Sequence, residues 1–234
     1  MAVPVGFAVR IRRTSMDYKQ ILVDFVEGRM PFAEFHDLVL NDDLFAAWID
    51  QHVPSDWKCY TKATPENNYT VQELPFSIRH KFEEFAGGDA ISSIGYRLDV
   101  HSTMTNLAKT LYPTMSIKPD PSFKKLFGLL LRACPSYIDG NDVWDSGILE
   151  AFAAECPDEW SDTKKIKHIK ARIIEEFHLE DKKYPRWWQN PDWPFANGKP
   201  MKYVKTTVKY KNEWYQHHFV DLETGEERIV DDMT

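Results

Sequence analysis

The spacing of the apolar residues changes once along this chain, close to Lys183. Before that point they recur every three, four and seven residues, which is typical of helices with one buried face. After it, the segment YPRWWQNPDWPFANGKP has four prolines and no helical period, and short runs of aromatic and β-branched residues follow. The sequence therefore predicts an α+β protein, with a multi-helix body of about seven or eight helices followed by a small C-terminal three-stranded antiparallel sheet.

Capping and stop signals set the expected helix boundaries. Ser15 is placed to cap the first helix, which stops at Gly28. Asn41 or Asp42 caps the third helix, whose buried face is expected to consist of Leu44, Phe45, Trp48 and Ile49. The other helices are expected to open at Pro31 and Pro75, and to cover residues 89–99, 101–111, 120–132, 142–154 and 161–178, the last of them capped by Ser161.

Two stretches lack helical spacing. Between Ser55 and Leu74 we expect a surface loop with a short extended piece near residues 69–71. Near the end of the chain, three runs separated by Lys-Asn-Glu and Glu-Thr-Gly-Glu predict a β-meander with strands at 201–211, 214–220 and 228–230. A sheet this small needs another element to cover one of its faces.

These patterns divide the chain into three parts. Residues 1–15 place Arg10, Arg12 and Arg13 after a short apolar run, the reverse of a secretory signal, so we interpret them as a disordered extension or a mis-called start. Residues 16–180 form the expected helical domain. Residues 181–234 form a Trp/Pro-rich crossing segment and the meander, packed on the helical body.

Composition narrows the function classes. The net charge of −7 disfavours the chain as a whole as a ligand for phosphate backbones or anionic membranes, and it favours a basic partner. The three cysteines, Cys59, Cys134 and Cys156, form no paired framework, which indicates reduced thiols in a cytoplasmic protein. No segment approaches the ~18 apolar residues that a membrane-spanning helix needs, so no membrane partner is expected.

Side chains that could carry chemistry are scattered. None of the eight histidines lies in a metal-ligand motif, and His217 and His218 should point to opposite faces of a strand. The sequence also lacks a G-x-S-x-G turn and the glycine-rich phosphate-binding motifs. We therefore expect no catalytic residue, no cofactor and no metal, and we do not expect an enzyme. An active site assembled from distant histidines and carboxylates stays an alternative.

Acidic side chains are the candidate binding residues. Residues 139–142 resemble a fragment of a calcium loop, but the remaining ligands are missing, and helix capping by Asn141 or Asp142 is the plainer interpretation. As a functional alternative, acids can form a surface complementary to a basic protein. The residues that we predict to bind such a partner are Asp42, Asp43, Asp139, Asp142 and Asp145.

The basic aromatic segment 182–215 supports a different function. It holds eight Lys or Arg against only Asp192 and Glu213, with Trp and Tyr between them, which is typical of a stacking surface for single-stranded nucleic acid. Two structural roles for the same side chains compete with this function. Tryptophans in a proline-rich segment often pin that segment to a core, and lysines often protect the edge of a sheet.

The same segment carries a family resemblance. YPRWWQNPDWP, followed by GKPMKYV and a hairpin with DLETGEERIV, resembles the C-terminal part of bacterial immunity proteins of polymorphic toxin systems. The opening MDYKQILVDFVEGRMPFAEFHDLVLND is similar to the N-terminal part of the same group, so the likeness covers most of residues 16–232. It rests on Trp-Pro spacing and layout, not on a catalytic signature.

The resemblance implies a protein of the bacterial cytoplasm that takes part in interbacterial competition. Such a protein binds a cognate toxin, delivered by a type VI secretion or Rhs-type route, and occludes its active site or substrate surface. The resemblance implies no particular inhibitory residue. Toxin inhibition by protein binding is therefore the predicted function, and nucleic-acid binding through residues 182–215 is the alternative.

Overall fold

The computed structural model describes residues 17–61, 72–85, 93–211 and 213–233. Within them the chain forms nine helices and a C-terminal three-stranded antiparallel sheet, so the predicted α+β class is confirmed. The buried residues gather in two hydrophobic cores, one formed by residues before position 112 and one formed mainly by residues after position 122. We call residues 17–112 the N-terminal lobe and residues 122–233 the C-terminal lobe. The extension expected at residues 1–15 lies outside the described residues.

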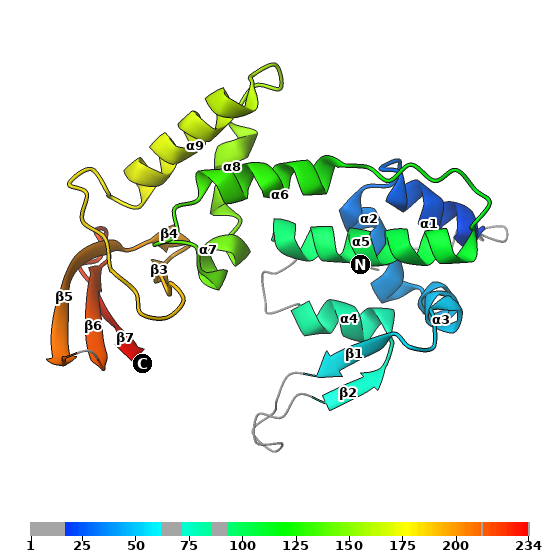
Figure 1. Ribbon diagram of the computed structural model, residues 1–234, viewed down its shortest axis with the longest axis horizontal. Helices are drawn as coiled ribbons and strands as arrows, with labels where there is room; N and C mark the ends of the chain where they lie inside the picture. Colours follow the sequence, from blue (N-terminus) through cyan, green and yellow to red (C-terminus); the bar gives the residue numbers. More distant parts are fainter. Residues whose placement is uncertain (1–16, 62–71, 86–92, 212, 234) are drawn as a thin grey trace, which may run out of the picture.

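The N-terminal lobe is a group of helices with a strand pair on one side (Figure 1). Its core is rich in phenylalanine, and the rings of Phe25 and Phe35 stack with centroids 3.9 Å apart. Met104 of the long helix α5 is completely buried in the same core. The elements are α1 (Tyr18–Val26), α2 (Phe32–Asn41), α3 (Asp43–His52), β1 (Lys58–Thr61), β2 (Gln72–Pro75), α4 (Ile78–Phe85) and α5 (Ile94–Leu111).

Several expected boundaries in this lobe were wrong. Asp17, not Ser15, caps α1, because its carboxylate accepts the N–H groups of the first turn, and Ser15 lies outside the described residues. A single helix, α5, replaces the two expected at 89–99 and 101–111, since no Gly or Pro lies near the expected break and Val100 and His101 are buried in succession. Residues 89–92 also lie outside the described part.

The expected loop at 55–74 contains two strands. β1 pairs antiparallel with β2, and the completely buried Cys59 lies opposite Leu74. Strands of four residues are too short to show a clear alternation, which is why the sequence did not reveal them. The extended piece expected near 69–71 lies outside the described residues.

The C-terminal lobe combines four helices with the sheet (Figure 1). The helices are α6 (Ser122–Ala133), α7 (Asn141–Asp145), α8 (Ile148–Ala154) and α9 (Asp162–Glu176). A small hairpin of β3 (Phe195–Ala196) and β4 (Lys199–Pro200) precedes the meander. The meander has the order β5-β6-β7 that the sequence predicts, with β5 (Lys202–Tyr210), β6 (Trp214–Val220) and β7 (Glu227–Met233).

The helix expected at 142–154 is divided. Gly147 adopts a positive φ of 71° between α7 and α8, which ends the first helix and redirects the chain. The residue preceding α7 is Gly140, and no side chain caps this helix, so the expected capping by Asn141 or Asp142 was wrong. The expected cap of α9 is confirmed, because the Ser161 hydroxyl accepts the N–H of Lys164.

The crossing segment covers the inner face of the meander. Trp193 is completely buried, and its indole N–H donates to the carbonyl of Met201 at 2.9 Å. Its ring packs edge-on against Phe177, which follows α9, and against Phe219 on β6, with centroids 5.3 and 5.2 Å away. The sheet and α9 therefore share one core, and the tryptophan lies between them.

The two lobes are joined along α5 and α6, which lie side by side (Figure 1). Arg97 of α5 forms an ion pair with Glu150 of α8, and its guanidinium lies 6.0 Å from the ring centroid of Phe123 on α6. The connecting segment also runs against α1, because the N–H of Asp120 donates to the carbonyl of Val26 at 2.8 Å. The two cores thus divide near residues 112–122. The boundary predicted at residue 180 marks the change from helix to strand, and the division into domains at that residue stays a prediction.

Candidate partner-binding site

The structure separates the five predicted binding acids into two groups. Asp42 and Asp43 lie where α2 meets α3 in the N-terminal lobe. Asp139, Asp142 and Asp145 lie on and just before α7 in the C-terminal lobe, and Figure 1 shows α7 on the other lobe from α2 and α3. The five acids therefore do not form one patch.

Two of the five carboxylates, Asp42 and Asp139, hold local structure. One Asp42 oxygen accepts the N–H groups of Leu44 and Phe45, both at 3.0 Å, so Asp42 is the one of the two predicted residues that caps α3. Asp139 accepts the indole N–H of Trp144 at 2.7 Å. Burial, the larger cause, and the charge of Asp142 together raise the pKa of Asp192, so these two carboxylates lie close enough to repel each other.

Asp43 forms an ion pair on the surface. Its side chain is 89% exposed, and its one ion pair in the described part of the chain is with Arg79, at 2.6 Å. Arg79 also donates to the carbonyl of Val39 at 3.0 Å, which fixes the guanidinium beside α2. Because water solvates this carboxylate, the pair contributes little to stability, about 0–1 kcal/mol, and the carboxylate is accessible to the cations of a partner.

Two apolar side chains lie at the same corner. Leu44 is 73% exposed, the highest value among the large apolar side chains of the described residues, and Leu40 is 44% exposed. They are separated by three residues at the junction of the two helices, and Asp37, Asn41 and Asp43 are also exposed there. We call Asp37, Leu40, Asn41, Asp43 and Leu44 the α2–α3 corner.

The sequence had placed Leu44 on the buried face of α3, and that was wrong. Phe45 and Ile49 are completely buried and Trp48 is half-buried, but Leu44 points outward from the first turn. Helical spacing admits both positions, since residues 44 and 45 lie about 100° apart around the axis. The signal that could have found it is the position of Leu44 directly after the capped turn, at the margin of the apolar stripe.

The charge of the chain is concentrated in the same lobe. By sequence, residues 17–112 contain fifteen Asp or Glu against eight Lys or Arg, a net charge of −7 that equals the value for the whole chain. Residues 122–233, the C-terminal lobe, contain twenty Asp or Glu against seventeen Lys or Arg, a net charge of −3. The electrostatic attraction for a basic partner is therefore expected to be strongest on the N-terminal lobe.

The basic aromatic segment 182–215 is largely used for packing. Trp193 is buried, and the half-buried Trp187 donates its indole N–H to the carbonyl of Tyr137 at 2.9 Å. Trp188 is 50% exposed and stacks on Tyr215. On the neighbouring strands, Asp231 accepts the indole N–H of Trp214 at 2.6 Å, so acidic charge lies on the same sheet as the lysines of β5.

One buried network has the order hydroxyl, imidazole, carboxylate. The Thr206 hydroxyl lies 2.8 Å from Nδ1 of His217, whose Nε2 lies 3.3 Å from a carboxylate oxygen of Asp232. His217 is completely buried, and burial lowers its pKa. Asp232 also accepts the backbone N–H groups of Trp188 and Gln189, so the network ties the crossing segment to the sheet.

His217 and His218 point to opposite faces of β6, as predicted. His217 contacts Asp232 inside the core, whereas His218 lies 2.6 Å from the hydroxyl of Thr207 on the other face. Among the described residues, no three His, Cys, Asp or Glu side chains are grouped so that they could hold a metal ion. Burial raises the pKa of the Cys134 thiol to about 12, which keeps it protonated.

The α2–α3 corner is thus the strongest candidate site, since it combines exposed apolar side chains with exposed acids. Within the described ranges, no helix has the length and apolar character needed to cross a membrane. No family model matches the chain, and no curated protein or solved structure shows a significant similarity to it.

Proposed function

We propose that this protein is an immunity-type inhibitor of the bacterial cytoplasm, which binds a cognate protein toxin and occludes its active site or substrate surface. The α2–α3 corner is part of the surface that it uses. The observation that carries the proposal is the 73% exposure of Leu44 beside the exposed carboxylate of Asp43, on the lobe with the larger net negative charge.

An apolar side chain with an acidic surround suits a tight inhibitor. Leu44 and Leu40 would enter an apolar pocket of the toxin, where removal from water supplies affinity. Asp37 and Asp43 would face Lys or Arg side chains at the rim of that pocket. Opposite charges would also raise the association rate, as they do in charge-steered inhibitor complexes.

Support also comes from the resemblance to immunity proteins of type VI and Rhs-type toxin systems. The Trp-Pro segment that carries this resemblance is the one that pins the sheet to α9. It therefore supports a shared architecture, while the binding residues come from the other lobe.

The test is co-expression with the product of the neighbouring gene, followed by copurification and a growth assay. The protein should form a complex and restore growth. Leu44→Arg and Asp43→Lys should together weaken the complex at least about tenfold, because one removes an apolar anchor and the other reverses a rim charge. Failure to form a complex, or full affinity in the double variant, would contradict the proposal.

The C-terminal lobe offers a matched control. Leu131 is 52% exposed on α6. Asp162 is the first residue of α9, as Asp43 is of α3, and it pairs with Arg132 at 2.6 Å, as Asp43 pairs with Arg79. Leu131→Arg with Asp162→Lys should leave the affinity within about twofold, because these residues lie on the opposite lobe. An equal loss in both double variants would show that the α2–α3 corner is not the contact surface.

Nucleic-acid binding is the second function to test, and the exposed ring of Trp188, which stacks on Tyr215 of the sheet, is the observation in its favour. Labelled single strands should be titrated at two salt concentrations. Tight binding that weakens steeply with salt, and that is lost in Trp188→Ala, would favour this function over toxin inhibition.

A further inference from the structure

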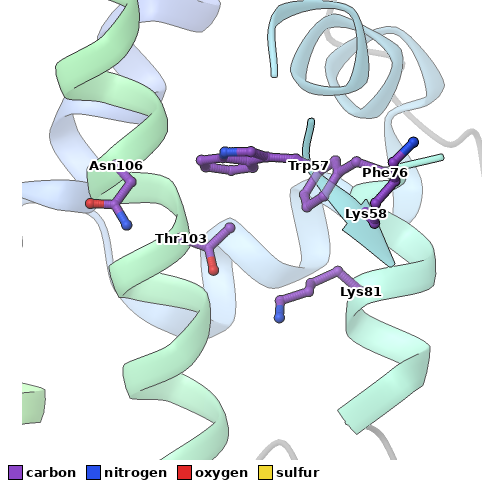
Figure 2. A pocket seen from close by; sticks show the side chains of 6 residues that line it. All are labelled: Trp57, Lys58, Phe76, Lys81, Thr103 and Asn106. Atoms are coloured by element: carbon purple, nitrogen blue, oxygen red, sulfur yellow. The ribbon is translucent and has the colours of Figure 1, made fainter. Parts of the chain in front are cut away.

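A cavity of about 340 Å³ opens in the N-terminal lobe between α4, α5 and the β1–β2 pair. Figure 2 shows the six side chains that line it, from four different parts of the chain. The volume lies at the lower end of the range of small-molecule sites, roughly 300–1,000 Å³. It is large enough for one aromatic ring with a short substituent.

One wall of the cavity is aromatic. Trp57 directly precedes β1 and Phe76 directly follows β2, and the pairing of Lys58 with Pro75 brings the two rings together. Their centroids are 5.5 Å apart with an interplanar angle of 65°. Trp57 is half-buried, and in Figure 2 its ring extends from the strand toward α5. A planar ligand can therefore stack on the indole face.

The opposite wall is polar. Thr103 and Asn106 are three residues apart on α5, so they lie on the same face of the helix, and Figure 2 shows them across the cavity from Trp57. A hydroxyl and an amide can each donate a hydrogen bond or accept one. They can therefore orient a polar substituent of a ring that stacks on the facing indole.

Lys81 of α4 supplies a positive charge at the base of this wall. Its side chain is only 16% exposed and reaches toward α5, where its ammonium lies 2.9 Å from a carboxylate oxygen of Asp99. An ammonium has three N–H groups, so it can keep this ion pair and still donate to a ligand. Lys58, at the margin, is the second cation of the lining, and Asp99 offsets the charge of Lys81. The net charge of this group is therefore +1, which favours a ligand with a single negative charge.

We propose that this cavity binds a small planar aromatic carboxylate. The ring stacks on Trp57, the carboxylate accepts a hydrogen bond from Lys81, and Thr103 and Asn106 fix its orientation. The cavity lies on different elements from the α2–α3 corner, so ligand binding here does not depend on the proposed inhibition of a toxin.

Indole-3-acetate and tryptamine form a matched pair of probes, because they share one ring and carry opposite charges. Each should be titrated into the full chain by calorimetry and by ligand-observed NMR. We expect saturable binding of indole-3-acetate, and binding of tryptamine at least about tenfold weaker, since the ammonium of tryptamine would face that of Lys81. Absence of saturable binding, or equal affinity for the two probes, would overturn the proposal.

Substitutions then locate the ligand. Trp57→Leu, Thr103→Val and Asn106→Ala should each weaken indole-3-acetate binding at least about fivefold, whereas Thr110→Val, on the same helix but outside the lining, should have no effect. Lys81 is tested in the double variant Lys81→Gln with Asp99→Asn. Removing both charges together ensures that the half-buried carboxylate of Asp99 is not left without its cation. Binding that survives in Thr103→Val, Asn106→Ala and this double variant would place the ligand elsewhere and reject the assignment.

Discussion

The two lobes stabilise their cores in different ways. The N-terminal core is formed by helices that interlock through many phenylalanine rings, and its strand pair is peripheral. The C-terminal core depends on a proline-rich segment without regular structure, which Trp193 and Trp187 fix by both ring packing and indole hydrogen bonds. Stability in the first lobe is therefore spread over many residues, while in the second it is concentrated in a few.

The lobes also differ in charge. The N-terminal lobe carries the larger net negative charge and the most exposed large apolar side chain of the described residues, whereas the C-terminal sheet balances lysines on β5 against acids on β7. The lobe whose core is distributed can present binding residues on its surface without loss of stability. The lobe whose core is concentrated supplies the contacts that hold its own segments together.

The largest expected effect is at Trp193. Trp193→Ala removes a completely buried ring and leaves the carbonyl of Met201 without its donor, so we expect the free energy of unfolding to fall by about 3–5 kcal/mol. Denaturant unfolding followed by circular dichroism measures it. Trp188→Ala, at a half-exposed ring, should cost less than about 1 kcal/mol. Equal losses would mean that the core is not concentrated at Trp193.

The ion pair between the lobes has the next largest effect. Glu150→Ala leaves the guanidinium of Arg97 half-buried without its carboxylate, and burial already lowers the pKa of Arg97. The side chains are 23% and 16% exposed, so we expect a loss of about 2–3 kcal/mol, below the value for fully buried pairs. The double variant Arg97→Met with Glu150→Leu should recover most of it. A double variant that is less stable than Glu150→Ala would contradict this interpretation.

The same contrast shows what the sequence could predict. Helical spacing and turn residues predicted the α+β class, the meander and the cap at Asp42, because these depend on neighbours in the chain. The pairing of β1 with β2 depends on residues that are far apart in the sequence. The candidate site was predicted only in part, since Asp43 lies there but Asp139 bonds to Trp144, and the exposure of Leu44 depends on tertiary packing.

A smaller loss of stability is expected at Gly28, which contacts the segment that connects the two lobes. This glycine has a positive φ of 76°, and a Cβ there would lie 2.9 Å from the side chain of Asp120, in the segment that runs along α1. Gly28→Ala should therefore cost about 1–3 kcal/mol, from backbone strain and close contact together. Gly225→Ala has the same kind of φ but open space around it, so it measures the backbone strain alone. Equal costs would show that the approach of Asp120 contributes nothing.

The smallest expected effect is the dependence of stability on pH, which we compare at one buried histidine in each lobe. His36 lies 3.0 Å from the hydroxyl of Tyr96 in the N-terminal core, and His217 lies against Asp232 in the C-terminal core. Burial lowers the pKa of both rings below the ordinary value of 6.5, against the opposing charges of Asp37 and Asp232. In the folded protein each of these histidines therefore takes up its proton at a lower pH than in the unfolded chain.

Well above pH 6.5 both rings are neutral in the folded and in the unfolded chain, so their contribution to the free energy of unfolding is complete. This contribution decreases as the pH falls through 6.5 toward the lowered pKa of the folded state. Unfolding free energies measured at intervals from about pH 7.5 to 5.5 should show this decrease. His36→Gln and His217→Gln should each make the curve flatter. If only one of the two flattens the curve, the lobes differ in how far they exclude the charged ring from water. If neither does, burial of these rings does not set the pH dependence of this fold.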